Sequence, residues 1–433
     1  METKFNFTFI GLGYVGLVNS VLLASFNQNV IGYDIDKNKV ELLKSGVSTI
    51  DEPNLQTLLT EARKSLRFTS NAKDAIRPNN IIVICVDIPI RKEDGKLDMS
   101  HYYQALDDIA ENVVQDCHII IKSTVPVGTN KMTKEYLESH SQFKFSVLSM
   151  PDFLSEGTAV YDTINPYRLV FGVNDEEAIQ FAQSIAPVFL AKKVPVLITS
   201  PNNAELIKLS SDAFIASKIS FTNSIADICD SLGCDIDRVS LGMSLDPRIG
   251  NSFLKPGIGF GGNIVDNIDV KNWALNKDNL EFEMLDKVKE RNEKQVQYFL
   301  DLISTKFKSV HNVTIGILGA SYKGNSEDIR NSPAISIIRN LLDRGADVKF
   351  YDPYAIDNVR KVLSRHTHVE YVDYALEAIK GTDFVLILTD HSEFKSLTKE
   401  DFILNMKKPI VIDGRNTFKK RDMEGVEYLS IGR

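Results

Sequence analysis

Short apolar runs alternate with segments of helical periodicity through about the first 195 residues, and this alternation constrains the fold more than any other feature of the chain. A strand that is apolar along its whole length has both faces buried, which is typical of a parallel sheet covered by helices. We therefore predict such a sheet, with strands in the apolar runs at 5–11, 29–34, 80–86, 118–124, 144–150 and 167–172.

The apolar period becomes helical between about residues 202 and 302, and the alternation of strand and helix patterns resumes at residue 313. The strands predicted in this last part lie at 313–319, 347–353, 382–390 and 409–416. The helical part contains two long amphipathic patterns, at 204–233 and 280–303. Strand and helix patterns on both sides of a helical stretch predict an α/β fold in three parts: an α/β domain, a helical middle and a second α/β domain.

Composition excludes several classes of function. The formal net charge is -8, with no cluster of basic residues along the chain, so we expect no nucleic-acid partner. No stretch approaches 18 apolar residues and no signal-peptide pattern opens the chain, so we expect no membrane association. The spacing of the four cysteines fits neither a zinc site nor a disulfide framework, which predicts no metal and a cytoplasmic location: Cys85, Cys117, Cys229 and Cys234.

A glycine-rich turn follows the first predicted strand. Gly11, Gly13 and Gly16 stand at the start of a helical pattern, where backbone N–H groups can hold a pyrophosphate. The next strand ends at Asp34, whose carboxylate can accept hydrogen bonds from a ribose and would repel the 2′-phosphate of NADP. The pattern predicts an NAD site, and the alternative is a glycine turn without a ligand.

Two further segments place polar residues after predicted strands. Lys122, Ser123 and Thr124 end one strand, at the edge where open α/β sheets bind ligands, although a polar turn is an equal alternative. Asp152 and Glu156 lie four residues apart and would share one face of a helical turn if the segment were helical. Taken alone, this pair is better explained as two solvated acids.

The long helical pattern carries a polar stripe. Glu205, Lys208 and Asp212 recur at i, i+3 and i+7 on a helix that is otherwise rich in apolar residues. A lysine that faces a dry site could stabilise an oxyanion or hold a water. An exposed stripe with salt bridges is an equal alternative from the spacing alone.

A loop at 255–262 contains four glycines, and it predicts a close approach of backbone to a sugar or phosphate. A flexible surface turn is the alternative, which the apolar Ile258 and Phe260 make less attractive. The last third opens with another strand and glycine turn but lacks the full dinucleotide pattern, so we expect a nucleotide pocket without an ordinary dinucleotide site. Each of its cationic candidates is individually more often a surface charge: Lys323, Arg330 and Arg415.

Many motifs in one order make the whole chain resemble the UDP-glucose/GDP-mannose dehydrogenase family, and within it the UDP-glucose 6-dehydrogenase branch. The motifs are "GLGYVGL", "DGKLDMS", "STVPVGT", "PDFLSEGTAVYD", "AELIKLSSDAF", "DPRIG", "PGIGFGG", "SYKGNSEDIRNSPA", "YDP" and "VIDGRN".

The resemblance implies two Rossmann-like domains joined by a central helical domain with a long helix, usually in a dimer. It implies boundaries at 1–200 for an NAD-binding domain, 201–305 for the helical domain and 306–433 for a UDP-sugar-binding domain. The implied reaction is a twofold oxidation of the C6 alcohol of a UDP-sugar with two NAD, in the supply of polysaccharide precursors. The implied partners are UDP-glucose or a related UDP-hexose and a second copy of the chain.

The resemblance also implies roles for individual residues. NAD would be bound by Gly11, Gly13, Tyr14, Val15, Gly16, Asp34, Lys37, Thr124 and Arg330. Catalysis would use Thr124, Glu156, Lys208, Asp212 and Asp269. The UDP-sugar would be bound by Phe153, Leu154, Glu156, Lys208, Arg248, Phe260, Gly261, Lys323 and Arg415.

Several positions depart from the family pattern. The family has a cysteine two residues after the glycine pair, where this chain has Ile264 in "GGNIVDNID". The segment is one residue longer than the family's, so Asp269 is a provisional match to the family aspartate. The family's asparagine on the long helix is Asp212, its glutamate in the "PEF" motif is Asp152, and its threonine after the third strand is Ile88.

The missing cysteine leaves three interpretations open, because its thiolate would capture the intermediate aldehyde for the second oxidation. The chain could stop at an aldehyde or ketone. It could oxidise the aldehyde hydrate, with Asp212 or Asp266 as base to a water. It could also bind NAD and a nucleotide sugar without turnover. We predict an NAD-dependent UDP-sugar dehydrogenase with an altered or truncated second step, and a catalytically silent family member is the alternative.

Overall fold

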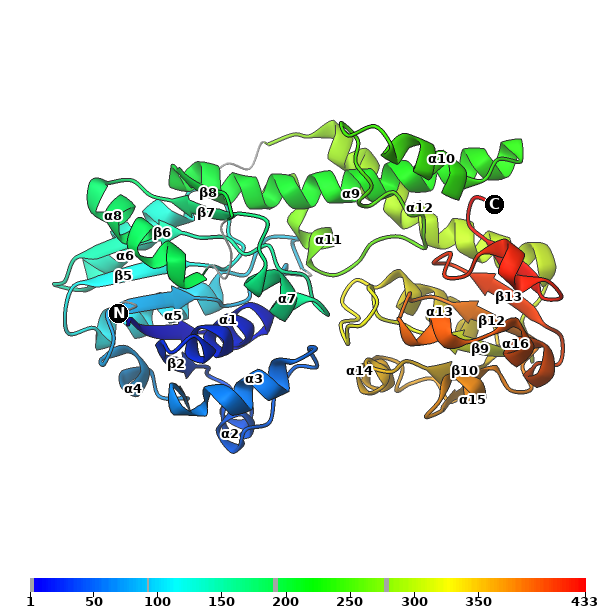
Figure 1. Cartoon of the computed structure of the whole chain (residues 1–433), viewed down its shortest axis with the longest axis horizontal. Coiled ribbons are helices and arrows are strands. Elements are labelled where there is room, and N and C mark those ends of the chain that lie inside the picture. The colour runs from blue at the N-terminus through cyan, green and yellow to red at the C-terminus, as the bar shows by residue number, and fades with distance from the viewer. Residues whose placement is uncertain (1–3, 92, 190–193, 276–279) are drawn as a thin grey trace. The chain divides into compact units, whose positions relative to one another are not determined.

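The computed structural model describes residues 4–91, 93–189, 194–275 and 280–433. The chain forms two compact units. The first runs to Ser211 and takes in Asp269–Glu281, and the second holds Asp212–Ile268 and Phe282–Arg433. Each unit contains a parallel sheet with helices around it (Figure 1), so the predicted α/β fold with a helical middle is confirmed.

The first unit is built on a sheet that has eight strands within the described residues, in the order β3-β2-β1-β4-β5-β6-β7-β8. Its pairs are parallel except for the contact between β6 and β7. The strands are β1 Asn6–Ile10, β2 Asn29–Tyr33, β3 Leu66–Thr69, β4 Ile81–Ile84, β5 Cys117–Ile121, β6 Phe145–Ser149, β7 Leu169–Gly172 and β8 Val196–Thr199.

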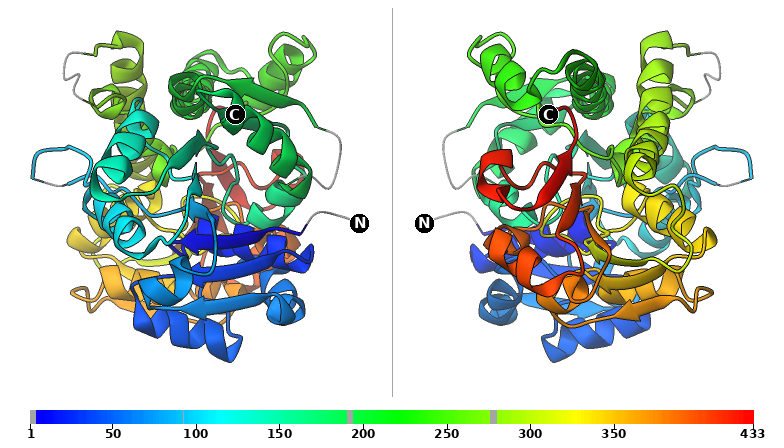
Figure 2. Two further views of the ribbon diagram at one scale, coloured as in Figure 1. Left: turned by 90° about the vertical axis from the view of Figure 1, so that its left-hand side faces the viewer. Right: turned by 90° about the vertical axis from the view of Figure 1, so that its right-hand side faces the viewer.

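Both faces of the first sheet are buried, because successive side chains of a strand point to opposite faces. In β4, Ile81 and Val83 join one apolar cluster, and Ile82 and Ile84 join the other. Helices cover both faces (Figure 2). The first cluster includes side chains from α1 Tyr14–Ser25, α3 Leu55–Glu61, α7 Ala159–Ile164 and α8 Glu176–Ile185, and the second includes α4 Ala72–Ile76, α5 Ser100–Asn112 and α6 Thr129–His140.

The second sheet has six strands within the described part of the chain, all parallel, in the order β11-β10-β9-β12-β13-β14. The strands are β9 Thr314–Leu318, β10 Asp347–Tyr351, β11 Val369–Tyr371, β12 Phe384–Ile387, β13 Ile410–Asp413 and β14 Glu427–Ser430. In both sheets the strand order reverses beside the first strand, between β1 and β4 and between β9 and β12. Open α/β sheets bind ligands at such reversals.

The helical middle agrees with the sequence periodicity. The two long helices are α9 Pro201–Leu232 and α12 Glu283–Lys306, and the boundary between the two units falls within α9. The remaining helices are α2 Lys37–Ser45, α10 Ile236–Ser244, α11 Asn263–Asn267, α13 Pro333–Asp343, α14 Ile356–Val362, α15 Ala375–Ile379 and α16 Lys399–Asn405. Short 3₁₀ turns are η1 Ala62–Lys64, η2 Ala186–Phe189, η3 Val270–Asn272, η4 Glu393–Ser396 and η5 Lys420–Met423.

The strands that the sequence did not predict stand at or near sheet edges. β3 and β8 are the edge strands of the first sheet, and β11 and β14 are those of the second. Each of the four has one or more partly exposed residues. An edge strand needs no continuous apolar run, because one of its sides is less covered. The apolar pattern therefore identified the central strands and missed these four.

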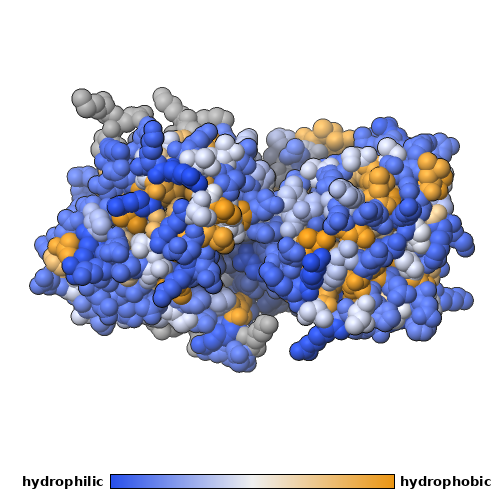
Figure 3. Space-filling view, turned by 90° about the horizontal axis from the view of Figure 1, so that it is seen from below, coloured by the Kyte–Doolittle hydropathy of each residue, from blue (hydrophilic) through white to orange (hydrophobic). Residues whose placement is uncertain are grey.

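The face of the molecule in Figure 3 is mostly hydrophilic, with apolar residues in smaller groups on both units. Among the described residues, none of the helices combines the length and the apolar character needed to cross a membrane.

Packing imposes different demands on two glycines of the first turn. A Cβ atom on Gly16 would lie 1.8 Å from the backbone oxygen of Gly11, whereas one on Gly13 would have only Asp87 Oδ2, at 3.9 Å, within 4 Å. Gly16→Ala should therefore push α1 off the turn and lower the free energy of unfolding by about 1–3 kcal/mol, measured in urea. Gly13→Ala is the matched control, expected to stay within about 0.5 kcal/mol of the wild type. Equal losses in the two variants would contradict this packing argument.

Candidate active site

The glycine turn between β1 and α1 fits a pyrophosphate. Gly11 has a φ of +89°, and its N–H donates to the carbonyl of Tyr33 on β2. Gly13 caps α1 without a side-chain hydrogen bond, so Tyr14 and Val15 begin the helix at an end where backbone N–H groups and the helix dipole favour an anion. The open space in front of Gly13 leaves room for one.

Asp34 is fixed at the end of β2, and only 7% of its surface is exposed. Its Oδ2 accepts hydrogen bonds from the N–H of Leu12 and from Lys39 Nζ, both at 2.9 Å, and its Oδ1 accepts one from the N–H of Asp36 at 3.0 Å. The carboxylate is thus held beside the glycine turn, as ribose binding requires. Lys39 was not among the predicted residues, and the predicted Lys37 is exposed in the first turn of α2.

Asp152 is partly buried and paired with a lysine, and the expected solvated acid pair is wrong. Its segment is not helical, and its carboxylate lies 2.8 Å from Lys122 Nζ at the end of β5. Asn19 of α1 and the N–H of Leu154 also donate to it. Burial alone would raise the pKa of Asp152, but the Lys122 ammonium outweighs burial and the pKa is lowered. Asp152 therefore ties the loop after β6 to β5 and α1.

Glu156 lies in the same loop and is also buried, with 6% of its surface exposed. The loop is held from a distant part of the chain, because Glu52 accepts hydrogen bonds from the N–H of Gly157 at 2.7 Å and of Val160 at 3.4 Å. Glu52 lies in the segment before α3 and was not predicted to take part in the site. Its partners are more than 100 residues away, so no local pattern could identify it.

The polar stripe on α9 is mostly buried, so the alternative of an exposed stripe is wrong. Glu205 and Asp212 are 3% and 7% exposed. Glu205 accepts hydrogen bonds from the N–H groups of Gly128 and Asn130, each at 2.8 Å, and from Ser149 Oγ at 3.1 Å. Burial raises the pKa of Glu205 to about 6. Glu205 thereby ties α9 to the start of α6.

A small pocket lies where β5, the loop after β6 and α9 meet. Its walls are formed by Ile121, Ser123, Thr124, Val125, Ser149, Pro151, Glu205 and Lys208. The aromatic ring of Phe153 lies 5.7 Å from Lys208 Nζ and 3.9 Å from the guanidinium of Arg168, which also donates to Ser211. The pocket thus combines a cation with hydroxyl groups at the carboxyl edge of the sheet.

The glycine loop of the second unit is buried, which rules out a flexible surface turn. Its glycines are required by contacts within the protein. A Cβ atom on Gly261 would lie 2.7 Å from Asn331 O, and one on Gly262 would lie 2.6 Å from the ring of Tyr322. Asn292 of α12 holds the loop by accepting from the N–H of Phe260 at 2.9 Å and donating to its carbonyl at 3.0 Å.

Arg415 connects three backbone segments of the second unit and is not a simple surface charge. It donates to the carbonyls of Leu388, Gly259 and Tyr322 at 2.8, 3.2 and 3.1 Å. Lys323 follows Tyr322 in the loop after β9 and is half-buried. The structure therefore brings the glycine loop, Arg415 and the loop after β9 together.

The remaining predicted residues of the second unit lie in different surroundings. Arg330 is half-exposed and binds Asp328 at 2.6 Å. Arg248 is 88% exposed and pairs with Asp246.

The segment after the glycine loop forms α11, with Ile264 in its first turn. Asp212 Oδ2 on α9 accepts a hydrogen bond from Asn267 Nδ2 at 2.7 Å. Asp266 accepts a longer one from Asn331 at 3.3 Å, and burial raises the pKa of Asp266. Asp269 belongs to the first unit and caps η3 by accepting from the N–H of Lys271.

The four cysteines are unpaired, and three of them are buried. Cys85 follows β4 and packs against the glycine turn, where burial raises the pKa of its thiol. Burial also raises the pKa of Cys117 to about 12. Cys229 is buried in the second unit and Cys234 is exposed. A buried thiol with a raised pKa is protonated at neutral pH and is therefore a poor nucleophile.

Three family models match the chain in order. They describe the UDP-glucose/GDP-mannose dehydrogenase family: its NAD binding domain at residues 5–189, its central domain at 202–294 and its UDP binding domain at 316–420.

Relatives match over nearly the whole chain. The UDP-glucose 6-dehydrogenase TuaD of Bacillus subtilis is 39% identical over 98% of this chain and 92% of its own length. The UDP-glucose 6-dehydrogenase of Rickettsia bellii is 36% identical over 99% of both chains. The structure of a UDP-glucose dehydrogenase from Pyrobaculum islandicum matches with a TM-score of 0.90 and 31% identity, over 100% of this chain and 98% of the other.

A UDP-D-ManNAc dehydrogenase from Pyrococcus horikoshii is also similar, with a TM-score of 0.85 and 27% identity over 99% of each chain. The glycine turn and Asp34 fit the cofactor of an NAD binding domain, and the relatives match from end to end. The chain therefore belongs to the UDP-glucose/GDP-mannose dehydrogenase family of NAD-dependent UDP-sugar dehydrogenases, with NAD as its cofactor.

Proposed function

We propose that this protein oxidises the C6 alcohol of UDP-glucose or a related UDP-hexose with NAD, and that its second oxidation is altered or truncated. The observation that carries the proposal is the pocket of Thr124, Glu205 and Lys208 at the carboxyl edge of the first sheet, the edge that also holds the glycine turn. Whole-length relatives that are named UDP-glucose 6-dehydrogenases support the choice of sugar.

NAD, when bound, accepts a hydride, and the chain supplies its binding groups. The backbone at residues 11–16 would hold the pyrophosphate, and the fixed carboxylate of Asp34 would accept hydrogen bonds from the adenosine ribose. We assign further cofactor contacts to Lys37, Thr124 and Arg330 through the family resemblance.

Lys208 would provide the positive charge for the first oxidation. Its ammonium lies over the Phe153 ring and lines the pocket, where it would stabilise the oxyanion that develops on the sugar oxygen. Thr124 and Glu156 would position a water for the later step, and Leu154 would help Phe153 to line the sugar subsite. Asp152 and Glu52 accept hydrogen bonds from backbone N–H groups of the loop after β6. These bonds support the arrangement, because they fix the backbone on both sides of Glu156.

The second oxidation lacks its usual nucleophile, because Ile264 cannot form a covalent bond to an aldehyde. Cys85 offers no replacement, since its buried thiol stays protonated. A water could replace the thiol if Asp212 or Asp266 took its proton. The hydrogen bond from Asn267 orients Asp212, and the raised pKa of Asp266 makes it a stronger base. Asp269 remains the proposed counterpart of the family aspartate.

Residues of the second unit would bind the nucleotide sugar. The UDP binding domain model covers residues 316–420, which include Lys323 and Arg415. Both belong to the loop assembly that also contains Phe260 and Gly261. Arg248 would complete this set, and its exposed guanidinium leaves it accessible to a ligand or a second chain.

We also propose a cytoplasmic location and a role in supplying polysaccharide precursors. The unpaired cysteines support a reducing compartment.

A catalytically silent protein that binds NAD and a nucleotide sugar is the second candidate, and Ile264 is the observation that favours it. The cofactor turn and the sugar loops would then persist without the nucleophile. Turnover separates the two candidates, because both require binding.

The number of NADH formed per UDP-glucose consumed measures how far the reaction proceeds. We expect one NADH per sugar, with a carbonyl product caught by an aldehyde trap, because the thiol required for a covalent second step is absent. Two NADH per sugar would support the hydrate route, and Asp212→Asn or Asp266→Asn should then reduce the ratio to one. Binding of both ligands without any NADH, across UDP-hexoses, would favour the silent candidate.

Lys208→Ala tests the charge in the pocket. Loss of one group that stabilises an oxyanion should lower kcat about 10²–10³-fold, with a much smaller change in KM for UDP-glucose. Lys294→Ala is the control, because Lys294 is an exposed residue of α12 paired with Glu290. Equal changes in kcat and KM for the Lys208 variant would point to a structural lysine.

We propose that the protein forms a homodimer through α9. Four large apolar residues of this helix recur at spacings of seven, seven and four, which places them on one face. They are Phe214, Phe221, Ile228 and Leu232, with exposures of 67%, 51%, 50% and 72%. A monomer would leave this stripe in water, so a second copy of the same helix is the proposed occupant.

Charge on this stripe should separate the subunits. Phe221→Asp would bury a carboxylate in the proposed interface, and light scattering after size exclusion should report a shift from dimer to monomer. Leu404→Asp is the control, since Leu404 of α16 is 81% exposed but lies outside the stripe. A wild-type monomer, or a dimer that persists with Phe221→Asp, would contradict this interface.

A further inference from the structure

The two sheets use corresponding acids in different ways. Asp34 follows β2 and Asp352 follows β10, and each accepts the N–H of the residue after a positive-φ glycine: Leu12 at 2.9 Å and Ala320 at 2.8 Å. In the cofactor turn such an acid is available to a ribose. Asp352 is only 1% exposed, and its Oδ1 accepts the N–H groups of the turn that follows β10. Asp352 is therefore bound by its own chain.

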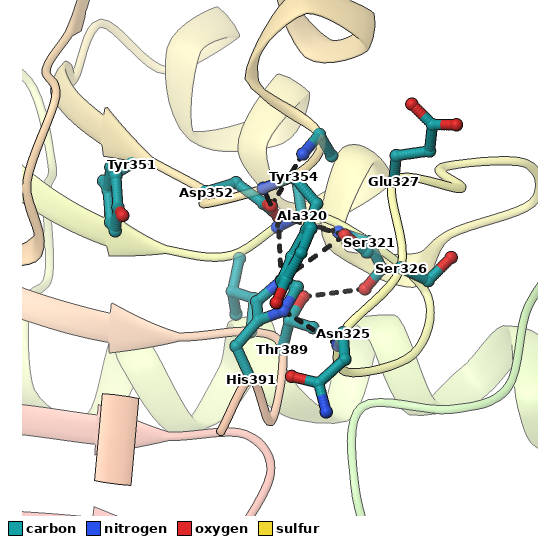
Figure 4. Close-up of polar contacts among 12 residues, drawn as sticks. Ala320, Ser321, Asn325, Ser326, Glu327, Tyr351, Asp352, Tyr354, Thr389 and His391 are labelled. Carbon is teal, nitrogen blue, oxygen red and sulfur yellow. Dashed lines mark hydrogen bonds and ion pairs between the residues drawn. The ribbon is translucent and has the colours of Figure 1, made fainter. Parts of the chain in front are cut away.

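His391 is the side chain that completes this arrangement (Figure 4). It is fully buried, with Nε2 at 3.2 Å from Asp352 Oδ2 and Nδ1 at 2.9 Å from the backbone N of Asn325. A backbone N–H can only donate, so Nδ1 must be the acceptor and Nε2 must carry the proton. The rings of Tyr354 and Phe394 lie 5.3 and 5.2 Å from the imidazole and restrict its rotation.

The contacts of His391 belong to a set that holds residues 321–325 against the segment after β12. Thr389 Oγ1 donates to the carbonyl of Ser321 at 2.7 Å, and Ser392 Oγ donates to Asn325 Oδ1 at 2.9 Å. A Cβ atom on Gly324 would lie 2.6 Å from the backbone oxygen of Asp390. The loop is thus attached by hydrogen bonds at its start and its end, and it is closely packed in its middle.

The proposed function assigns part of this loop to the binding of the nucleotide sugar. Lys323 lies between the attachment points, and the carbonyl of Tyr322 accepts from Arg415 at 3.1 Å. A change in the path of the loop would therefore move Lys323 and remove an anchor of the Arg415 guanidinium.

We propose that His391 is a positioning residue for nucleotide-sugar binding. Its neutral imidazole donates to Asp352, which is fixed, and accepts from the N–H of Asn325. These two bonds set the path of the loop that carries Lys323. The assignment of this loop to the nucleotide sugar rests on the proposed function. The attachment of the loop to His391 does not.

Two substitutions separate the two bonds of the imidazole. The side-chain oxygen of His391→Asn is as far from Cβ, in bonds, as Nδ1, so it can still accept from Asn325 but loses Asp352. The amide nitrogen of His391→Gln corresponds to Nε2, so it can still donate to Asp352 but leaves the N–H of Asn325 without an acceptor. If His391 acts through the loop, the glutamine variant should lose the fixed path of the loop and the asparagine variant should keep it.

Hydrogen exchange of the free full-length protein measures the loop directly. We expect His391→Gln to raise exchange in peptides that cover residues 321–327, and His391→Asn to keep it near that of the wild type. Unchanged exchange in the glutamine variant, or an equal increase in both variants, would overturn the attachment.

Calorimetric titration with UDP and UDP-glucose measures the consequence for binding. Loss of one hydrogen bond to the loop should raise the Kd of His391→Gln about tenfold, with NAD affinity and kcat within about twofold of the wild type. His368→Gln is the matched control, because His368 forms an exposed pair with Asp347 in the same sheet. Faster loop exchange with unchanged UDP affinity would overturn the link to the nucleotide.

The two measurements also separate this inference from the proposed function. A wild-type protein that fails to bind UDP and UDP-glucose would contradict the proposed function, and with it the role of His391 in nucleotide binding. The exchange data would still decide whether His391 holds the loop. UDP binding that is intact in the wild type and in both His391 variants would contradict the positioning role alone.

Discussion

Loops at the carboxyl ends of buried parallel strands expose backbone N–H groups that need acceptors, and buried carboxylates of this chain satisfy many of them. Asp34 binds the cofactor turn, Glu52 the loop that carries Glu156, and Glu205 the start of α6. In the second unit, Asp352 binds the turn after β9, and Asp413 accepts from three N–H groups after β13. The candidate sites are built from the loops that these carboxylates hold.

Burying these carboxylates has an electrostatic cost, which differs from one carboxylate to another. Burial raises the pKa values of Glu205 and Asp413, because their hydrogen bonds do not fully replace water. Burial also opposes the charge of Asp152 and Asp352, but Lys122 and His391 outweigh it and lower the pKa values. Asp152 and Asp352, which have a cationic and an imidazole partner, thus hold their loops as ionised carboxylates. These loops carry the residues assigned to the sugar.

The glycines of the loop in the second unit are explained by packing alone. Gly261 and Gly262 are required by Tyr322 and Asn331 of the same unit, whatever chemistry the loop serves. Their presence therefore says little about the chemistry of the residues that follow them. Ile264, in the first turn of α11, leaves in place the packing that requires the glycines.

The sequence by itself determined the central strands, both long helices, and the glycine turn after the first strand with Asp34 at the end of the next one. Each of these depends on residues close together in the chain, where apolar period and glycine spacing carry the information. The sequence also pointed to Lys208, but it left open whether its stripe was buried.

Only the tertiary structure decided the ion pair of Asp152, the burial of Glu156, the edge strands, and the parts taken by Glu52 and His391. Glu52 binds partners 105 and 108 residues away, and His391 binds partners 39 and 66 residues away. A carboxylate or imidazole far from its partner in sequence has no local signature, because the strand order of the sheet brings the two together. The fold therefore determines which acids accept hydrogen bonds from the backbone, and the local sequence does not reveal them.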